Sequence, residues 1–157
     1  MDITYRKATP KDIDTLIKLR LDYLTTDRGN LSREETEAIV TQLKDYFPRQ
    51  LNNSFIAFFA EHNGETISTV YMVVSEIPAN PSFITGKTAT ILNVFTYPDY
   101  RRKGIATKLL TMMISEAKAM NISYLELSAT ASGKPLYEKL GFVCKQSKYT
   151  EMRLNLI

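Results

Sequence analysis

The residues that could carry out chemistry begin with a basic run, Arg101-Arg102-Lys103-Gly104-Ile105-Ala106. This run follows an extended segment, residues 88–96, and precedes a stretch with helical spacing that reaches about Met120, so it lies at a helix N-terminus. Backbone N–H groups are unpaired there and the helix dipole is positive, which favours phosphate oxygens. Gly104 would let the backbone approach such a ligand closely. The run therefore indicates an anion site, although a basic helix start exposed to solvent would have the same sequence.

Two other nucleotide-binding patterns are excluded. Gly86-Lys87-Thr88 matches the end of a Walker A sequence, but Pro81 stands where its first glycine belongs. The pattern G-x-G-x-x-G is absent, so a Rossmann dinucleotide site has no support. An anion at residues 101–106 would therefore be held by a different arrangement.

Two segments together resemble the GNAT superfamily of N-acetyltransferases. Residues 91–110, ILNVFTYPDYRRKGIATKLL, resemble its strand–turn–helix signature, whose core R/Q-x-x-G-x-G/A here reads Arg101-x-x-Gly104-x-Ala106. Further along, residues 135–142, PLYEKLGF, resemble its second signature. The resemblance implies an α+β fold over a single domain, residues 1–157, with a mixed, mostly antiparallel sheet of about seven strands and helices on both faces.

The resemblance also implies where acetyl-CoA, the co-substrate, binds. It would lie where two neighbouring parallel strands, residues 88–96 and 124–129, splay apart. The backbone of Val94, Phe95 and Thr96 would pair with the pantetheine arm and polarise the thioester carbonyl. The pyrophosphate would rest on the turn formed by Arg101, Arg102, Lys103, Gly104, Ile105, Ala106 and Thr107.

Tyr137 matches the tyrosine that protonates the departing CoA thiolate in many members of this family. A phenol with a pKa near 10, held beside a thiolate whose thiol has a pKa near 8.5, can give up a proton and recover it from water. The alternative is a tyrosine that packs a short helix onto the sheet. Within this motif, the catalytic role is the favoured interpretation.

The general base is left open by the sequence. The strand before the basic turn offers only Thr88, Thr90 and Asn93 where a titratable residue would be useful. Glu126 is one candidate, because strand alternation points it away from its apolar neighbours and toward the cleft, although such a glutamate more often faces solvent. Otherwise water would carry the proton away from the amine.

We expect acetyl transfer to a primary amine of a small molecule or peptide by direct attack, without an enzyme-bound intermediate. Cys144 is therefore not cast as a nucleophile, and we expect it to be a small core residue on a closing strand. The alternative is a non-catalytic acyl-CoA-binding module that senses CoA or regulates a partner. Release of free thiol in the presence of amines would distinguish the two.

Composition excludes several classes of protein. Hydrophobic residues at 44% and charged residues at 24% are typical of a soluble globular domain. The longest apolar run, residues 55–60, is far below the roughly 20 residues of a membrane span, and the N-terminus lacks an export signal, so we expect a cytoplasmic protein with no membrane partner. One cysteine and one histidine predict no disulfide and no metal site. A net charge of +3 does not argue for nucleic acid, and a homodimer remains open.

The elements that must position these residues follow from local patterns. Capping sequences at Thr9 and Ser32 begin two helices, the second of which should stop at Pro48. His62-Asn63-Gly64 joins two antiparallel strands and accounts for the only histidine as part of a turn. The order strand, helix, strand around residues 88–128 implies a parallel pair. The remaining expected elements are a strand at 3–8, a loop at 77–82, a short helix at 135–140, and closing strands at 142–145 and 150–156.

Overall fold

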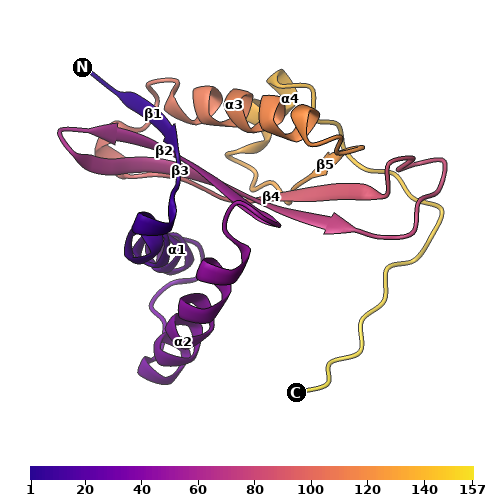
Figure 1. Cartoon of the computed structure of the whole chain (residues 1–157), viewed down its shortest axis with the longest axis horizontal. Helices are drawn as coiled ribbons and strands as arrows, with labels where there is room; N and C mark the ends of the chain where they lie inside the picture. Colours follow the sequence, from indigo (N-terminus) through magenta and orange to yellow (C-terminus); the bar gives the residue numbers. More distant parts are fainter.

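A five-stranded sheet forms the centre of the computed structural model, which describes residues 1–157 (Figure 1). Its strand order follows the sequence, β1-β2-β3-β4-β5, and β4 and β5 form the one parallel pair, as the strand–helix–strand pattern predicts. The strands are β1 (Thr4–Lys7), β2 (Phe55–His62), β3 (Glu65–Glu76), β4 (Lys87–Thr96) and β5 (Leu125–Glu126).

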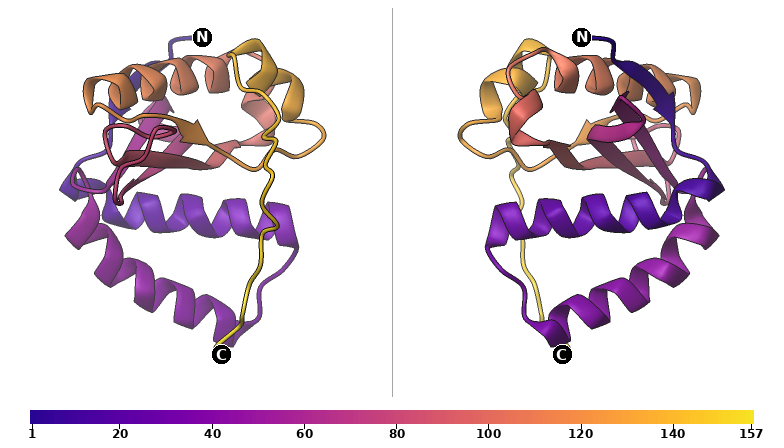
Figure 2. Two further views of the ribbon diagram at one scale, coloured as in Figure 1. Left: turned by 90° about the vertical axis from the view of Figure 1, so that its right-hand side faces the viewer. Right: turned by 90° about the vertical axis from the view of Figure 1, so that its left-hand side faces the viewer.

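Two helices cover each face of this sheet (Figures 1 and 2). On one face lie α1 (Ile13–Arg28), which the short 3-10 helix η1 (Pro10–Asp12) precedes, and α2 (Arg33–Gln50). On the other face lie α3 (Ile105–Ala119), which follows the 3-10 helix η2 (Pro98–Tyr100), and α4 (Lys134–Lys139). The α+β architecture with helices on both faces is thus confirmed, and none of the helices has the length and apolar character needed to cross a membrane.

The predicted helix starts are confirmed by their capping contacts. Thr9 and Asp12 form a capping box ahead of α1, and Ser32 and Glu35 form another at the start of α2. The predicted end of α2 is wrong, because the helix continues through Pro48 to Gln50. Pro48 lies in the last turn, where one missing backbone donor does not interrupt the helix.

Two hydrophobic cores lie between the sheet and the helices, one on each face. Alternate residues of β2 point in opposite directions, so Ile56 and Phe58 pack in the α3 core, whereas Phe55 and Phe59 pack in the core beneath α1 and α2. In the second core the buried Tyr71 hydroxyl donates a hydrogen bond of 2.7 Å to the carbonyl of Leu16. This bond fixes α1 against β3.

The hairpin turn confirms the expected place of the only histidine. Asn63 and Gly64 both have positive φ, 51° and 78°, as a turn between β2 and β3 requires. Nδ1 of His62 lies 2.9 Å from the carbonyl oxygen of Asp2, and its ring packs edge-on against Tyr100. His62 therefore holds the turn to the N-terminal segment.

Strand β4 contains a bulge, and its pairing with β5 ends early. Leu92 pairs with Tyr71 and Phe95 with Thr69, so Asn93 and Val94 together lie opposite one residue of β3. Asn93 adopts φ 53° at this bulge. Strand β5 pairs with β4 only at Ala89 and Thr90, so residues 91–96 have no strand partner on that side.

The two closing strands predicted at 142–145 and 150–156 are absent, so the sheet has five strands rather than about seven. Beyond Gly141 the chain forms no regular element; residues 142–145 still pack beside α4 and β5, and the chain then runs away from the body of the protein (Figure 1). Alternation shows only that a segment suits a strand, and β5 offers it an edge of two residues. Cys144 is exposed on this segment and is not the core residue that we expected.

Candidate active site

The site begins where β4 and β5 part. The last paired residues are Thr90 and Glu126, and beyond them β4 continues alone to Thr96. The bulge at Asn93 changes the direction of β4 at the start of this unpaired stretch. Val94, Phe95 and Thr96, the predicted pantetheine contacts, therefore lie on a strand edge that β5 does not cover.

The basic turn connects the end of β4 to the N-terminus of α3. The first hydrogen bond of the helix runs from the N–H of Lys108 to the carbonyl of Gly104, at 3.1 Å. No side chain caps the helix, so the N–H groups of Ile105, Ala106 and Thr107 have no acceptor within the protein. These donors and the positive end of the helix dipole suit an anion such as a pyrophosphate.

Backbone geometry explains the glycine in this turn. Gly104 has φ 78°, a left-handed conformation that side chains disfavour, and a Cβ placed there would meet no atom within 4 Å. We expected the glycine to permit close approach of a ligand, and the structure adds that the turn itself requires it. Arg102 adopts a similar conformation at φ 64°, so the chain reverses sharply before α3.

The side chains of the turn divide into structural and free groups. Nε of Arg101 donates to the carbonyl of Thr96 at 2.9 Å and thereby holds the turn against the end of β4. Arg102 and Lys103 are exposed, and neither has a carboxylate within ion-pairing distance. Ile105 is buried in the α3 core and can offer a ligand only its backbone. Arg102 and Lys103 are thus the cations available to an anion.

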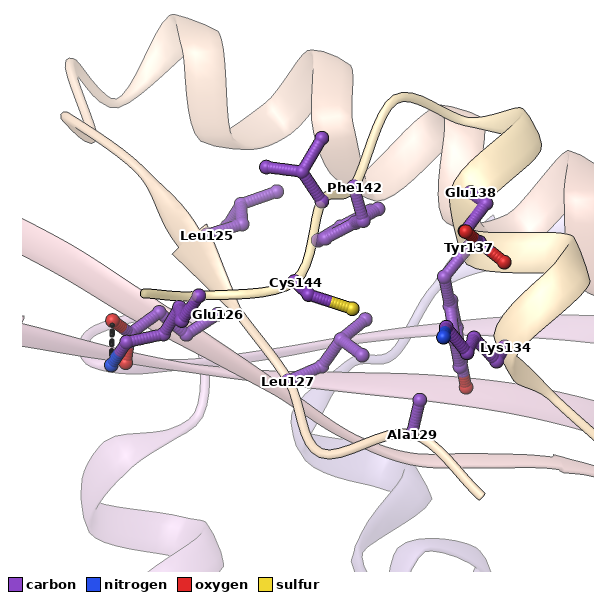
Figure 3. Close-up of a pocket in the computed structure, with 11 residues that line it drawn as sticks. Leu125, Glu126, Leu127, Ala129, Lys134, Tyr137, Glu138, Phe142 and Cys144 are labelled. Atoms are coloured by element: carbon purple, nitrogen blue, oxygen red, sulfur yellow. Dashed lines mark ion pairs between the residues drawn. The ribbon is translucent and has the colours of Figure 1, made fainter. Parts of the chain in front are cut away.

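Tyr137 lies on α4 and lines a cavity of about 360 Å³ between α4, β5 and residues 142–145 (Figure 3). Its ring packs edge-on against Phe142, with the centroids 6.0 Å apart. Burial, and secondarily the charge of a nearby Tyr23, raises the pKa of Tyr137 above its ordinary value. Its hydroxyl has no hydrogen-bond partner in the protein, so it is available to a ligand.

Glu126 lies at the opposite end of this cavity. Its carboxylate pairs with Nζ of Lys145 at 2.8 Å, and this hydrogen bond raises the pKa of Lys145. The side chains of Glu126 and Tyr137 do not point toward each other (Figure 3). Leu125 and Leu127 line the same cavity, so alternation does not set Glu126 apart from its apolar neighbours, and the two candidate catalytic groups are not brought together.

Helix α1 contributes residues that sequence reasoning missed. Tyr23 contacts Phe95 edge-on at 6.4 Å between ring centroids and lies near Tyr137. The spacing of Leu16, Leu19 and Tyr23 on one helical face was the signal that could have placed Tyr23 against the sheet.

A hydrogen-bonded group of Lys18, Asp22 and Tyr97 joins α1 to the residue that follows β4. Asp22 accepts hydrogen bonds from Nζ of Lys18, at 2.7 Å, and from the hydroxyl of Tyr97. Burial alone would raise the pKa of Asp22, but these two hydrogen bonds outweigh it and keep the pKa below its ordinary value. Asp22 is therefore an ionised carboxylate that already has two partners.

Comparison with known proteins identifies related chains. The model of the acetyltransferase (GNAT) family matches residues 16–142. The crystal structure of a predicted acetyltransferase with acetyl-CoA from Clostridium acetobutylicum is 33% identical, covers 97% of this chain and 96% of its own, and superposes with a TM-score of 0.83. A GCN5-related N-acetyltransferase from Ralstonia eutropha is 22% identical over 96% of this chain and 99% of its own, with a TM-score of 0.78. A search of curated protein sequences finds no significant match.

Proposed function

We propose that the acceptor is a primary amine that attacks the thioester directly, because this chain belongs to the acetyltransferase (GNAT) family. It is an N-acetyltransferase with acetyl-CoA as its co-substrate. The observation that carries this proposal is the parting of β4 and β5 after Thr90, beside the uncapped N-terminus of α3. An unpaired strand edge suits the amide groups of pantetheine, and the helix end suits the pyrophosphate.

The residues of this chain take distinct parts in the reaction. Backbone N–H groups near Val94–Thr96 polarise the carbonyl oxygen of the thioester. The amine nitrogen forms its bond to the carbonyl carbon as the carbon–sulfur bond breaks. Tyr137 gives its proton to the leaving thiolate and recovers one from water, and the nitrogen loses its extra proton to water. Arg102, Lys103 and the first N–H groups of α3 hold the pyrophosphate throughout.

No single carboxylate acts as an essential base in this proposal. Glu126 is paired with Lys145, and Asp22 is held by Lys18 and Tyr97. Either carboxylate would have to break its hydrogen bonds before it could accept a proton, which would raise the free-energy barrier of proton abstraction. Water in the open cleft is therefore the acceptor of the proton.

The alternative is a non-catalytic module that binds acyl-CoA and reports on it to a partner. Nothing in the structure favours this alternative. The free hydroxyl of Tyr137, which a sensor would not need, supports catalysis instead.

The test is release of free CoA thiol from acetyl-CoA in the presence of a panel of amines: polyamines, aminoglycosides, amino acids and peptides. We expect amine-dependent thiol release with at least one class, and the acetylated amine by mass spectrometry. Binding of acetyl-CoA by calorimetry, with no thiol release from any amine, would instead support the sensor.

We also propose that the chain forms one domain and assembles as a homodimer through its C-terminal segment. Six of the nine large hydrophobic side chains that are exposed lie in residues 143–157. Met152, Leu154 and Leu156 alternate with polar residues, as in a strand with one apolar face, yet this segment pairs with no strand of its own chain. Each copy also has an open edge at β5, so exchange of this segment between two copies would cover both features at once.

A further inference from the structure

A second cavity, of about 490 Å³, lies between α1 and α2. The two helices diverge toward the loop that joins them (Figure 2). Its walls are mostly aliphatic, with Leu24 from α1 and Ile39 and Leu43 from α2 among the lining residues. Arg20 and Arg28 project from α1 into the same lining. A cavity with aliphatic walls and a few charged groups is the usual form of a small-molecule site.

The charged groups of this cavity leave it cationic. Neither Arg20 nor Arg28 has a carboxylate within ion-pairing distance. The one carboxylate of the lining, Glu35, accepts the backbone N–H of Ser32 at 2.9 Å, and the hydrogen bonds from Ser32 keep its pKa below the ordinary value. It therefore serves the capping box and does not neutralise the arginines.

The sequence that builds this cavity is acidic overall, although the cavity itself is cationic. Residues 10–47 hold 8 acidic and 6 basic side chains, which would suit a cationic ligand. In the structure most of these acids have partners of their own, including Asp22 with Lys18, Glu37 with Arg33 and Asp45 with Arg49. The cavity wall is thus more basic than the segment that builds it.

Arg20 also connects the cavity to the reaction site. Its Nη1 donates to Oδ1 of Asn93 at 3.2 Å. Asn93 is buried at the bulge of β4 and directly precedes Val94, the first residue of the proposed thioester contacts. A group bound by the remaining donors of Arg20 would therefore lie beside the stretch of β4 where the acetyl group is transferred.

We propose that the amine acceptor carries an anionic group, a carboxylate or a phosphate, which Arg20 and Arg28 bind. This inference rests on the proposed acetyl transfer to an amine. A guanidinium presents paired donors that match the two oxygens of either anion. Arg20 is half-buried, and a partly desolvated cation without a carboxylate gains most from a ligand that supplies the missing charge. The aliphatic wall contacts the carbon chain of the acceptor.

The experiment compares pairs of amines with and without an anionic group, and kcat/KM is expressed per neutral amine because the amine pKa also differs within each pair. The carboxylate arm uses amino acids of increasing chain length and their primary amides, and the phosphate arm uses phosphoethanolamine and ethanolamine. We expect kcat/KM to be at least about 10-fold higher for the anionic member in one arm, because hydrogen bonds between charged groups are the stronger ones. The arm that shows the preference identifies the anion.

Variants then assign the preference to the cavity. Arg20→Gln should lower kcat/KM for the anionic acceptor by about 10- to 100-fold more than for its neutral partner, because the loss of the bond to Asn93 is common to both. Arg28→Gln should have a smaller effect of the same kind, and this exposed residue can be changed without disturbing the core. Arg33→Gln is the matched control, since Arg33 pairs with Glu37 and does not line the cavity. Affinity for acetyl-CoA should be the same in all three variants.

Acetylation of neutral and anionic amines with equal efficiency, or equal losses for both in Arg20→Gln, would overturn the inference and leave acetyl transfer intact. If no amine releases thiol, the proposed function fails, and binding decides the inference separately. Inorganic phosphate is then titrated by calorimetry into protein saturated with CoA. Binding that weakens in Arg20→Gln and Arg28→Gln but not in Arg33→Gln supports the anion site, and identical binding in all of them overturns it.

Discussion

Tyr137 combines a half-buried ring with a hydroxyl that has no partner in the protein. Gly133, one turn earlier, lies against the ring, and a Cβ at this position would come within 3.2 Å of Cε2 of Tyr137. The ring therefore contacts Phe142 edge-on and lies close to the backbone of Gly133. This arrangement fixes the ring and leaves the hydroxyl free.

Tyr137→Phe should lower kcat by about 10²-fold or more, the usual scale of general acid catalysis, and should leave acetyl-CoA affinity nearly unchanged. Because burial raises the pKa of Tyr137, its acid form persists to higher pH than that of a free phenol. The wild-type rate should therefore not decline on the alkaline side until above about pH 10. Steady-state rates across pH and calorimetry measure both effects. Loss of affinity and melting temperature together with activity would show that Tyr137 is a packing residue.

Glu126→Gln should cost well under the 10²- to 10⁴-fold that follows loss of a general base, because this carboxylate is already paired with Lys145. In the wild type, log(kcat/KM) should then climb with pH toward the pKa of the substrate amine. Kinetics of the folded variant check this prediction. A loss of about 10³-fold or more with acetyl-CoA still bound would make Glu126 the base.

At the scale of elements, the proposed pyrophosphate site is the N-terminus of α3. Gly104→Glu should abolish acetyl-CoA binding, because the new carboxylate projects into open space at the helix end and repels the phosphates. Gly64→Glu is the matched control, since Gly64 has the same φ of 78° and equally open surroundings in the β2–β3 turn. Calorimetry compares the two. Unchanged affinity in the Gly104 variant would remove the turn from the site.

The start of α1 is tied to the sheet by an ion pair. Nη1 of Arg6 on β1 lies 2.8 Å from Oδ2 of Asp12, and hydrogen bonds from Arg6 lower the pKa of this carboxyl to about 2. A lowered folded-state pKa stabilises the protein above the unfolded value, about pH 4, and this contribution disappears as the pH falls toward 2.

Asp12→Asn should therefore reduce the free energy of unfolding by about 2 kcal/mol at neutral pH, and the difference from wild type should vanish near pH 2. Denaturant unfolding at several pH values measures it. Asp45→Asn removes an exposed i,i+4 pair and should cost less than about 0.5 kcal/mol. Equal effects of the two variants would mean that the Arg6–Asp12 pair contributes no more than a surface pair.

Elements governed by local chemistry could be predicted from the sequence. The capping residues Thr9 and Ser32 and the Asn63-Gly64 turn satisfy backbone groups within a few residues, so their signals lie in short segments. The family motifs likewise placed Gly104 and Tyr137 at a helix end and beside a cavity. The residues of the site remain predictions that the variants above test.

Features that depend on distant partners could not be predicted. The contact between Arg20 and Asn93 joins residues 73 positions apart, and the bulge that presents Asn93 depends on the register between β3 and β4. The absent closing strands have the same cause, since alternation in residues 150–156 carries no information on which edge accepts them. Cys144 was misplaced because its burial was inferred from that missing strand.

At the scale of the whole molecule, the C-terminal segment is the largest departure from a closed surface. Leu154 and Leu156 are 82% and 86% exposed, which leaves apolar side chains of an irregular segment in solvent. Exchange with a second copy would bury them against β5. The proposed dimer would thus account for the unpaired segment.

Leu154→Glu should convert the dimer to a monomer, because a carboxylate would have to be buried at the exchanged strand. Arg153→Gln changes the opposite face of the same segment and should leave the dimer intact. Sedimentation equilibrium over a range of protein concentrations measures both. A wild-type protein that stays monomeric at every concentration contradicts the exchange.

A ligand bound along the strand edge left open beyond Thr90 would also stabilise the folded protein, by an amount that depends on the ligand concentration. A ligand that completes this edge binds the native protein and not the unfolded chain, so it adds RT ln(1 + [L]/Kd) to the free energy of unfolding. At a concentration 100 times Kd this amounts to about 2.7 kcal/mol, a large fraction of the stability of a typical domain. The supply of acetyl-CoA would thus set how strongly the protein resists unfolding as well as how fast it works.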